Sequence, residues 1–346
     1  MTNADRVTLR AWLLSDAPAS RSQAALGLAY RRWRRFATNP LNLFGLAILV
    51  VLIVVAIVGP LIMPHDPLRQ VLADRLLPPG SPSHWLGTDQ LGRDILSRLI
   101  GGARLTLGIA LLVVVIVVGR RGAGGPPGRG GRRVGGPRGV GGPPPPRPPA
   151  RRGGARRRRR RPPPPPPTAG YCRGFVDSVL MRITDVALAF PKIVLALAFA
   201  AALGPGVINA VVAISITAWP AYARLARAET IRIAQADYIH AARLQGASGP
   251  RILLRYIVPL CMSSVIVRAT LDMAGIILTV AGLGFLGLGA QPPSPEWGFM
   301  VASGRNVLLD AWWVATLPGA AILLVSLAFN LLGDGLRDVF DPRHGA

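Results

Sequence analysis

Long apolar blocks separated by short polar stretches run along most of the chain. The clearest block, residues 41–63, contains no charged residue. A helix that crosses the hydrocarbon core of a bilayer needs roughly 20 apolar residues, so this block predicts a membrane-spanning helix. Five further blocks follow the same pattern, and together they predict an all-α, polytopic membrane protein with six transmembrane helices. The predicted spans are 41–63, 99–118, 187–203, 207–222, 260–288 and 314–332.

The charges around these blocks predict how the chain crosses the membrane. Residues 1–40 are polar and basic and end in a cluster of arginines just before the first block. Basic residues favour the cytoplasmic side, so this cluster predicts a cytoplasmic N-terminus; a nucleic-acid-binding patch is the weaker alternative. The stretch 64–98 balances four aspartates against four arginines, as expected of an external loop. Six spans then return the tail, residues 337–346, to the cytoplasm.

The pattern breaks between the second and third spans. Residues 119–168 are almost entirely Gly, Pro and Arg, and their 15 arginines supply most of the formal net charge of +24. A segment with so few apolar residues cannot bury a core, which predicts disorder. Three interpretations stay open: binding to anionic lipid, binding to nucleic acid, or an insertion or sequence error. The last is favoured because Arg, Gly and Pro are what GC-rich codons give when read out of frame.

An amphipathic stretch, residues 237–259, separates the fourth and fifth blocks within the basic loop 224–259. Residues 238–245 are good helix formers, and Gly246 predicts the end of that helix because glycine tolerates positive φ. A second short helix is expected from Arg251 towards Pro259, with Arg251 and Arg255 on one face. The paired Ala241 and Ala242 would present a small, smooth surface that suits packing against another protein.

The spacing of these residues resembles the cytoplasmic "EAA" loop of permeases in binding-protein-dependent ABC importers, E-A-A-x3-G-x9-I-x-L-P. Three positions depart from that pattern: His240 stands for Glu, Tyr256 for Ile and Val258 for Leu. Residues 86–98 resemble the L-G-T-D-x-x-G-R-D-x-x-S-R signature of the dipeptide, oligopeptide and nickel branch of these permeases. Their glycines and aspartates would either shape turns and caps or dock a partner. Residues 289–298 and 330–343 resemble further segments of the same family.

The resemblance implies a type I ABC importer permease (MetI-like) fold, with a permease core over 169–336. The chain would be the second, C-type transmembrane subunit of an ATP-driven importer of peptides, nickel or related solutes in a bacterial or archaeal cytoplasmic membrane. Its implied partners are two ABC ATPase subunits, a second permease subunit in a heterodimer, an extracytoplasmic solute-binding protein and membrane lipid, with no specific nucleic acid. The implied ATPase-coupling residues are Tyr238, Ala241, Ala242, Gly246 and Pro259.

Enzymatic functions find little support in the sequence. No G-x-x-x-x-G-K-[ST] motif is present to cradle ATP phosphates, so ATP is expected on partner subunits and no cofactor on this chain. The four histidines are scattered outside the predicted spans, no H-E-x-x-H occurs, and two cysteines are too few for a disulfide framework. The rival function is a membrane-anchored basic protein that binds nucleic acid or anionic lipid through its Arg-rich tract.

One pair of charged residues falls inside the fifth predicted span. Arg268 and Asp272 are four residues apart, and therefore lie on one helical face where they can neutralise each other. An ionisable pair inside a membrane marks a functional site by default, so Arg268 and Asp272 are candidates to line the solute pathway. The alternative is an internal structural pair that faces another helix.

Overall fold

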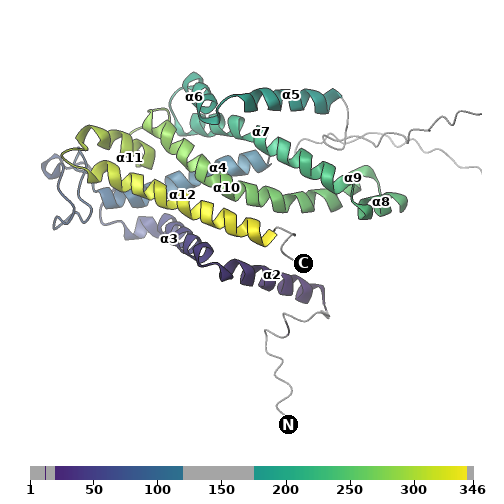
Figure 1. Cartoon of the computed structure of the whole chain (residues 1–346). Helices are drawn as coiled ribbons and strands as arrows, with labels where there is room; N and C mark the ends of the chain where they lie inside the picture. Colours follow the sequence, from purple (N-terminus) through teal and green to yellow (C-terminus); the bar gives the residue numbers. More distant parts are fainter. Residues whose placement is uncertain (1–11, 13–19, 120–174, 341–346) are drawn as a thin grey trace, which may run out of the picture.

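The computed structural model describes residue 12, residues 20–119 and residues 175–340. The described part of the chain is helical and contains no strand, which confirms the all-α prediction. Most of the Arg-rich tract, residues 120–168, lies outside the described residues, as do Cys172 and the end of the predicted cytoplasmic tail, 341–346. The long helices lie roughly side by side, with a loop region at one end and two short helices at the other (Figure 1).

Within the described residues, five helices are long and apolar enough to cross a membrane. They lie close to five of the six predicted spans, and the first, predicted as 41–63, agrees within a residue at each end. These helices are α3 (Pro40–Ile62), α4 (Ile95–Gly119), α7 (Val207–Ala234), α10 (Val258–Phe285) and α12 (Trp313–Phe340). Helix α10 continues the short α9 (Gly249–Ile252) through a π-turn (Leu253–Ile257).

The third span, predicted as one helix over 187–203, is instead a broken element. Helix α5 (Phe175–Ala189) ends before Pro191, and α6 (Lys192–Leu203) starts after it at an angle of 96°. Pro191 disfavours helical backbone at the residue before it, and its ring prevents a helix from running through. Helix α6 has 12 residues and is about 18 Å long, too short to cross the bilayer alone. The part of the chain that the structure describes therefore holds six candidate spans only if α5 and α6 count as one.

Several helices run beyond the predicted spans. Helix α4 starts within the predicted loop 64–98, because Asp94 accepts a hydrogen bond from the backbone N–H of Ser97 at 2.8 Å. Helix α7 continues past residue 222 to Ala234, since its Ala, Arg and Leu residues are good helix formers whether or not they lie in lipid. Helix α12 likewise continues past residue 332 to Phe340.

The N-terminal arginine cluster lies on a separate amphipathic helix, α2 (Arg21–Thr38). Ser20 caps its N-terminus by accepting a hydrogen bond from Gln23 N–H at 3.1 Å. Pro40, at the first position of α3, forces a break between the two helices. The guanidinium of Arg32 stacks over the Phe340 ring at 4.9 Å, so α2 lies against the C-terminal end of α12.

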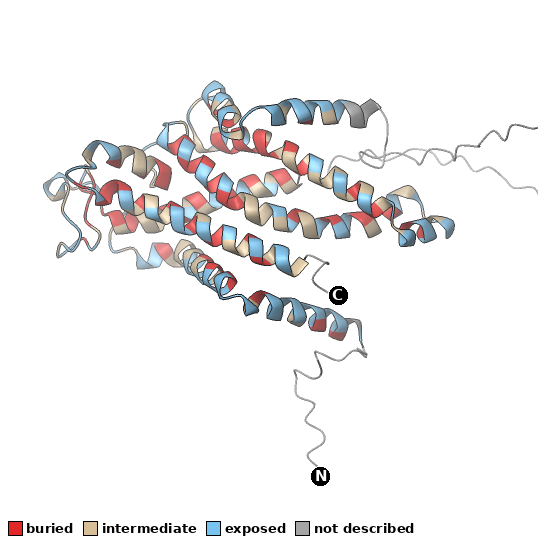
Figure 2. Cartoon of the chain, viewed as in Figure 1, coloured by how far each residue is buried: buried red, intermediate tan, exposed pale blue. Residues whose placement is uncertain are grey.

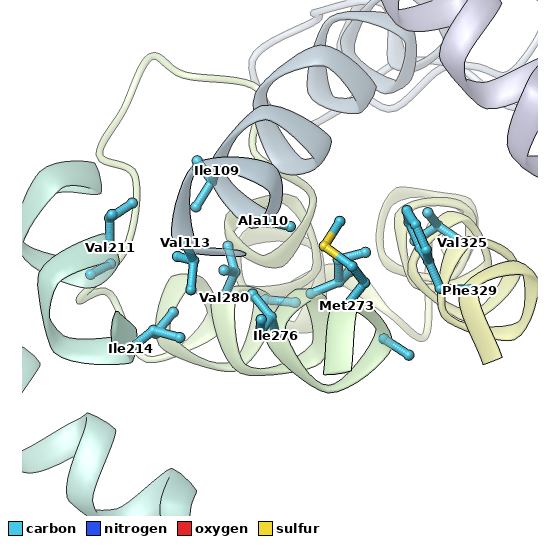
Figure 3. Packing of buried hydrophobic residues seen from close by; sticks show 14 of the residues in the cluster. Ile109, Ala110, Val113, Val211, Ile214, Met273, Ile276, Val280, Val325 and Phe329 are labelled. Carbon is cyan, nitrogen blue, oxygen red and sulfur yellow. The ribbon is translucent and has the colours of Figure 1, made fainter. Parts of the chain in front are cut away.

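The apolar core lies where α4, α7, α10 and α12 meet. Val113 of α4, Ile214 of α7, Ile276 of α10 and Val325 of α12 are almost completely buried there (Figure 3). Helix α10 is the most enclosed of the candidate spans, whereas α3 buries only 17% of its apolar window. The exposed apolar surface of α3 and of the outer sides of α12 (Figure 2) suits contact with lipid or with another membrane subunit.

Candidate functional site

The two short helices at one end of the bundle form the candidate coupling site. Helix α8 (Asp237–Leu244) follows α7 and precedes the four-residue α9 (Gly249–Ile252), and both project beyond the long helices (Figure 1). The helix predicted over 238–245 is therefore present, displaced by one residue. Asp237 lies in its first turn and Arg243 in its last, where each charge is favourable to the helix dipole.

Gly246 ends α8 in the way that its sequence position predicts. Its φ is +82°, in the left-handed region that glycine adopts without steric strain. The backbone N–H groups of Gly246 and Ala247 donate to the carbonyl oxygens of Arg243 and Ala242, at 3.0 and 3.1 Å. This hydrogen-bond pattern is a Schellman motif, which fixes the direction in which the chain leaves the helix.

The inner side of the coupling site is an apolar cluster that is separate from the main core. Ile233 of α7, Ile239 of α8 and Ile252 of α9 pack together with Ile257 and Cys261. The three isoleucines that α8, α9 and the following turn contribute are no more than 1% exposed. Because these residues come from every element around the site, the cluster joins the short helices firmly to the ends of α7 and α10.

The outer side of α8 presents apolar side chains that nothing in the described chain covers. Tyr238 is 46% exposed and Leu244 is 90% exposed, and Ala241 lies on the surface between them. Ala242 is only 7% exposed and faces inward. The predicted surface of paired alanines is therefore divided: Ala241 is accessible, whereas Ala242 packs against the chain itself. Sequence reasoning missed Leu244, although it lies one turn beyond Ala241.

The second predicted helix, 251–259, is not a separate element. Helix α9 leads through a π-turn (Leu253–Ile257) directly into α10, so that residues 249–285 form one continuous helical rod. Pro259 lies in the first turn of α10, where its missing N–H is tolerated. The Val258 N–H donates to the Leu253 carbonyl oxygen, five residues back, which is the wider hydrogen bond of a π-turn. Arg251 and Arg255 are both exposed.

A polar contact ties α7 to α10 just above the coupling site. The Ser264 hydroxyl of α10 donates to a carboxylate oxygen of Glu229 on α7 at 3.1 Å. The other oxygen of Glu229 accepts two hydrogen bonds from the Arg232 guanidinium, at 3.0 and 2.8 Å. No local sequence pattern predicts this contact, because Glu229 and Ser264 are 35 positions apart.

The charged pair predicted inside α10 is present. Arg268 Nε donates to Asp272 Oδ2 at 3.0 Å, and the side chains are 49% and 15% exposed, respectively. Lys192, at the start of α6, interacts electrostatically with Asp272. The pair is thus placed where α10 faces α6, with the arginine reaching the surface of the chain.

The opposite end of the molecule is a folded cap built from residues 64–94 and the short helix α11 (Trp297–Gly304). Asp89 receives hydrogen bonds from the backbone N–H of Arg93 at 3.0 Å and from Arg93 Nε at 2.7 Å, and Arg98 Nε lies 3.7 Å from the same carboxylate. All three side chains are buried. The signature 86–98 therefore shapes and holds the cap, and its charged residues do not form a surface for a partner.

Two tryptophans fasten this cap to the long helices. Trp297 Nε1 donates to the Leu99 carbonyl oxygen at 3.1 Å, and Trp313 Nε1 donates to that of Thr88 at 3.2 Å. Glu296 caps α11 by accepting from the N–H groups of Gly298 and Phe299. Burial raises the pKa of the Glu296 carboxyl above its ordinary value, although these two hydrogen bonds oppose the shift.

A bundle of membrane-length helices, with a folded cap at one end and an exposed helical turn at the other, defines the membrane subunit of a larger transport assembly. Comparison with known families agrees. Residues 168–345 match the family of binding-protein-dependent transport system inner membrane components, and residues 28–79 match the N-terminal TM domain of oligopeptide transport permease C. The chain belongs to this family of inner membrane components, and is a multi-pass permease subunit of an ABC importer.

Characterised relatives match over most of their length. The chain is 41% identical over 316 residues to the di/tripeptide transport system permease protein DppC of Pseudomonas aeruginosa, covering 90% of this chain and 91% of the relative. It is 40% identical over 307 residues to the probable D,D-dipeptide transport system permease protein DdpC of Escherichia coli, covering 89% of each. It is 37% identical over 331 residues to the glutathione transport system permease protein GsiD of Pectobacterium atrosepticum, covering 96% of each.

Proposed function

We propose that this chain carries peptides across the bacterial or archaeal cytoplasmic membrane, and that separate ATPase subunits drive it through α8. The names of the relatives support a short peptide as the solute, since they include a di/tripeptide, a D,D-dipeptide and a glutathione permease. Nickel, which the sequence pattern left open, is not named among these three. Both termini and the coupling site lie in the cytoplasm in this proposal, on the side that the excess of basic residues favours.

The observation that carries the proposal is the exposed apolar face of α8. Tyr238, Ala241 and Leu244 lie outward on a helix whose opposite face is locked into the apolar cluster around Ile239. An uncovered apolar face on a firmly held helix is suited to a protein partner, because docking buries the face and the partner's movement passes to the bundle. Gly246 fixes the end of this helix, and Pro259 lies in the first turn of α10 within the long rod that follows.

ATP is bound and hydrolysed by the partner subunits in this scheme, because the sequence has no motif that would cradle its phosphates. Two ATPase subunits, a second permease in a heterodimer and a solute-binding protein on the side of the cap complete the assembly. Arg268 and Asp272 line the pathway between the two permeases, where a zwitterionic peptide meets charges of both signs.

Co-purification with the ATPase subunits tests the contact. The full-length chain is expressed with the ATPase, partner permease and binding-protein genes of its own transport system, as wild type, Leu244→Arg and Leu72→Arg. Leu72 is the matched control, since it is 69% exposed but lies in the cap. We expect the ATPase to be lost from Leu244→Arg and retained by Leu72→Arg. Equal retention by both variants would exclude α8 as the contact.

Uptake by the same assembly tests the solute. Labelled dipeptide and tripeptide uptake is measured in cells that lack other peptide importers, with unlabelled peptides or Ni²⁺ as competitors. We expect competition by short peptides and none by Ni²⁺. If only Ni²⁺ suppressed uptake, the solute would be a metal ion and not a peptide. The proposed ATPase contact at α8 would be unaffected by that result.

A further inference from the structure

Two histidines and an aspartate gather on one side of the cap. His84 Nδ1 lies 3.0 Å from Asp94 Oδ1, and His65 Nδ1 lies 3.9 Å from Asp94 Oδ2. The two imidazole rings are 4.7 Å apart, and one potential ligand atom from each of the three residues falls within 4.8 Å of the others. These residues are distant in sequence, so the fold of the cap brings them together.

The hydrogen bonds of the cap leave part of this group unused. Nδ1 of His65 is buried and has no hydrogen-bond partner, although leaving a buried polar atom unsatisfied is unfavourable. Asp94 Oδ2 accepts from the Ser97 N–H and hydroxyl, and Oδ1 is held by His84. On the far side of the His84 ring, Nε2 lies 3.9 Å from Asp74 Oδ2. His65 Nδ1 thus faces Asp94 Oδ2 at 3.9 Å, which is too far for a hydrogen bond.

The surroundings favour a positive ion. An open cavity of about 200 Å³ is lined by His65 and His84 together with three carboxylates and one guanidinium. The charged lining residues are Asp66, Asp74, Asp94 and Arg69. The lining therefore carries an excess of negative charge, which attracts cations and opposes anions.

We propose that His65, His84 and Asp94 bind a divalent cation of the zinc class at this position. Zinc takes imidazole nitrogen and carboxylate oxygen at about 2.0–2.2 Å, often with three protein ligands and an open fourth position. Small side-chain rotations would draw the three ligand atoms together around such an ion, and would give the His65 nitrogen its missing partner. Ca²⁺ and Mg²⁺ fit less well, because they prefer six or more oxygen ligands.

The ion would cross-link three segments of the chain. His65 follows the end of α3, His84 belongs to the loop, and Asp94 immediately precedes α4. A metal bound to the folded cap but not to the unfolded chain stabilises the cap in proportion to its affinity. Zinc would therefore stiffen the junction between α3 and α4 at the end opposite the ATPase contact.

Equilibrium zinc binding tests the site. The full-length chain, purified through a tag without histidines, is titrated with Zn²⁺ against a zinc-sensitive dye as wild type, His65→Gln and His240→Gln. His240 is the matched control, since it is exposed on α8 at the other end of the molecule. We expect one Zn²⁺ per wild-type chain, a Kd at least tenfold higher for His65→Gln, and an unchanged Kd for His240→Gln. Equal binding by all three proteins, or no stoichiometric binding by the wild type, overturns the proposal.

A measurement on the wild type keeps the test independent of how the variants fold. Zinc X-ray absorption on the one-to-one complex is expected to show nitrogen and oxygen ligands near 2.0 Å, with the multiple-scattering features of two imidazoles. A first shell of water alone, without imidazole, would mean that zinc binds adventitiously and would also overturn the assignment.

Discussion

Replacing Asp89 by asparagine removes the negative charge that faces two buried arginines in the cap. The carboxylate faces Arg93 at 2.7 Å and Arg98 at 3.7 Å, and the three side chains are between 1% and 8% exposed. Asparagine keeps the shape of the side chain and one acceptor oxygen. It cannot compensate the two guanidinium groups, which stay buried with their charges.

The size of the effect follows from this burial. Removing one partner of a buried ion pair destabilises a protein by about 3–5 kcal/mol, because the remaining charge is left without compensation. The pair Asp185–Arg224 provides the comparison, with side chains that are 56% and 58% exposed and atoms 2.6 Å apart. An exposed pair contributes about 0–1 kcal/mol, since water already solvates both charges. Asp185→Asn is therefore the matched control for Asp89→Asn.

Thermal unfolding of the purified protein in detergent measures the difference between the two variants. A gap of about 2 kcal/mol or more corresponds to at least about 3 °C in the melting midpoint of a chain of this length. We expect Asp89→Asn to melt lower than Asp185→Asn by that margin, and to accumulate less in the membrane. If the two variants melted within about 1 °C of each other, the reasoning from burial and charge would be refuted.

Three further predictions test other parts of the molecule. Gly246 has a φ of +82°, a left-handed backbone conformation that asparagine tolerates better than valine. Gly246→Val should therefore uncouple ATP hydrolysis from uptake more strongly than Gly246→Asn. Equal effects of the two substitutions would contradict this prediction. Asp272→Asn should lower peptide uptake while ATPase co-purification and melting stay unchanged; a lower melting midpoint with normal uptake per folded protein would identify a structural pair instead. A Cβ at Gly102 would lie 2.5 Å from the Trp297 ring, whereas one at Gly108 would meet nothing, so Gly102→Val should lower the melting midpoint and Gly108→Val should not.

Local patterns in the sequence were enough to predict much of the fold. A run of apolar residues without charges has one stable arrangement in lipid, so α3 was predicted within a residue. The end of α8 at Gly246 could be predicted from the backbone preference of glycine and from the helix-forming residues before it. The contact between Arg268 and Asp272 could be predicted from their spacing of one helical turn.

Features that depend on distant contacts were not predictable in the same way. Pro191 interrupts the third predicted span, but a proline only ends a helix, and no local pattern sets the 96° angle between α5 and α6. Ala242 lies on the same face of α8 as Ile239, whose apolar cluster draws residues from four other elements of the chain. His65 and His84 appeared to be scattered loop residues, because only the folded cap places them beside Asp94.

The continuity of α10 explains how a displacement of α8 is transmitted to the opposite end of the molecule. One helical rod leads from Gly249 to Phe285, and it is the most buried of the candidate spans, at 56% of its window. Within the half of the rod nearer the coupling site, the Ser264 hydroxyl donates a hydrogen bond to Glu229 of α7. At the upper end of the rod, Gly284 lies so close to the Glu296 carboxylate that a side chain there would collide with it. A packed helix moves as a unit, because a close-packed interior transmits displacement instead of absorbing it. A displacement of the coupling site should therefore be transmitted through this helix to α11.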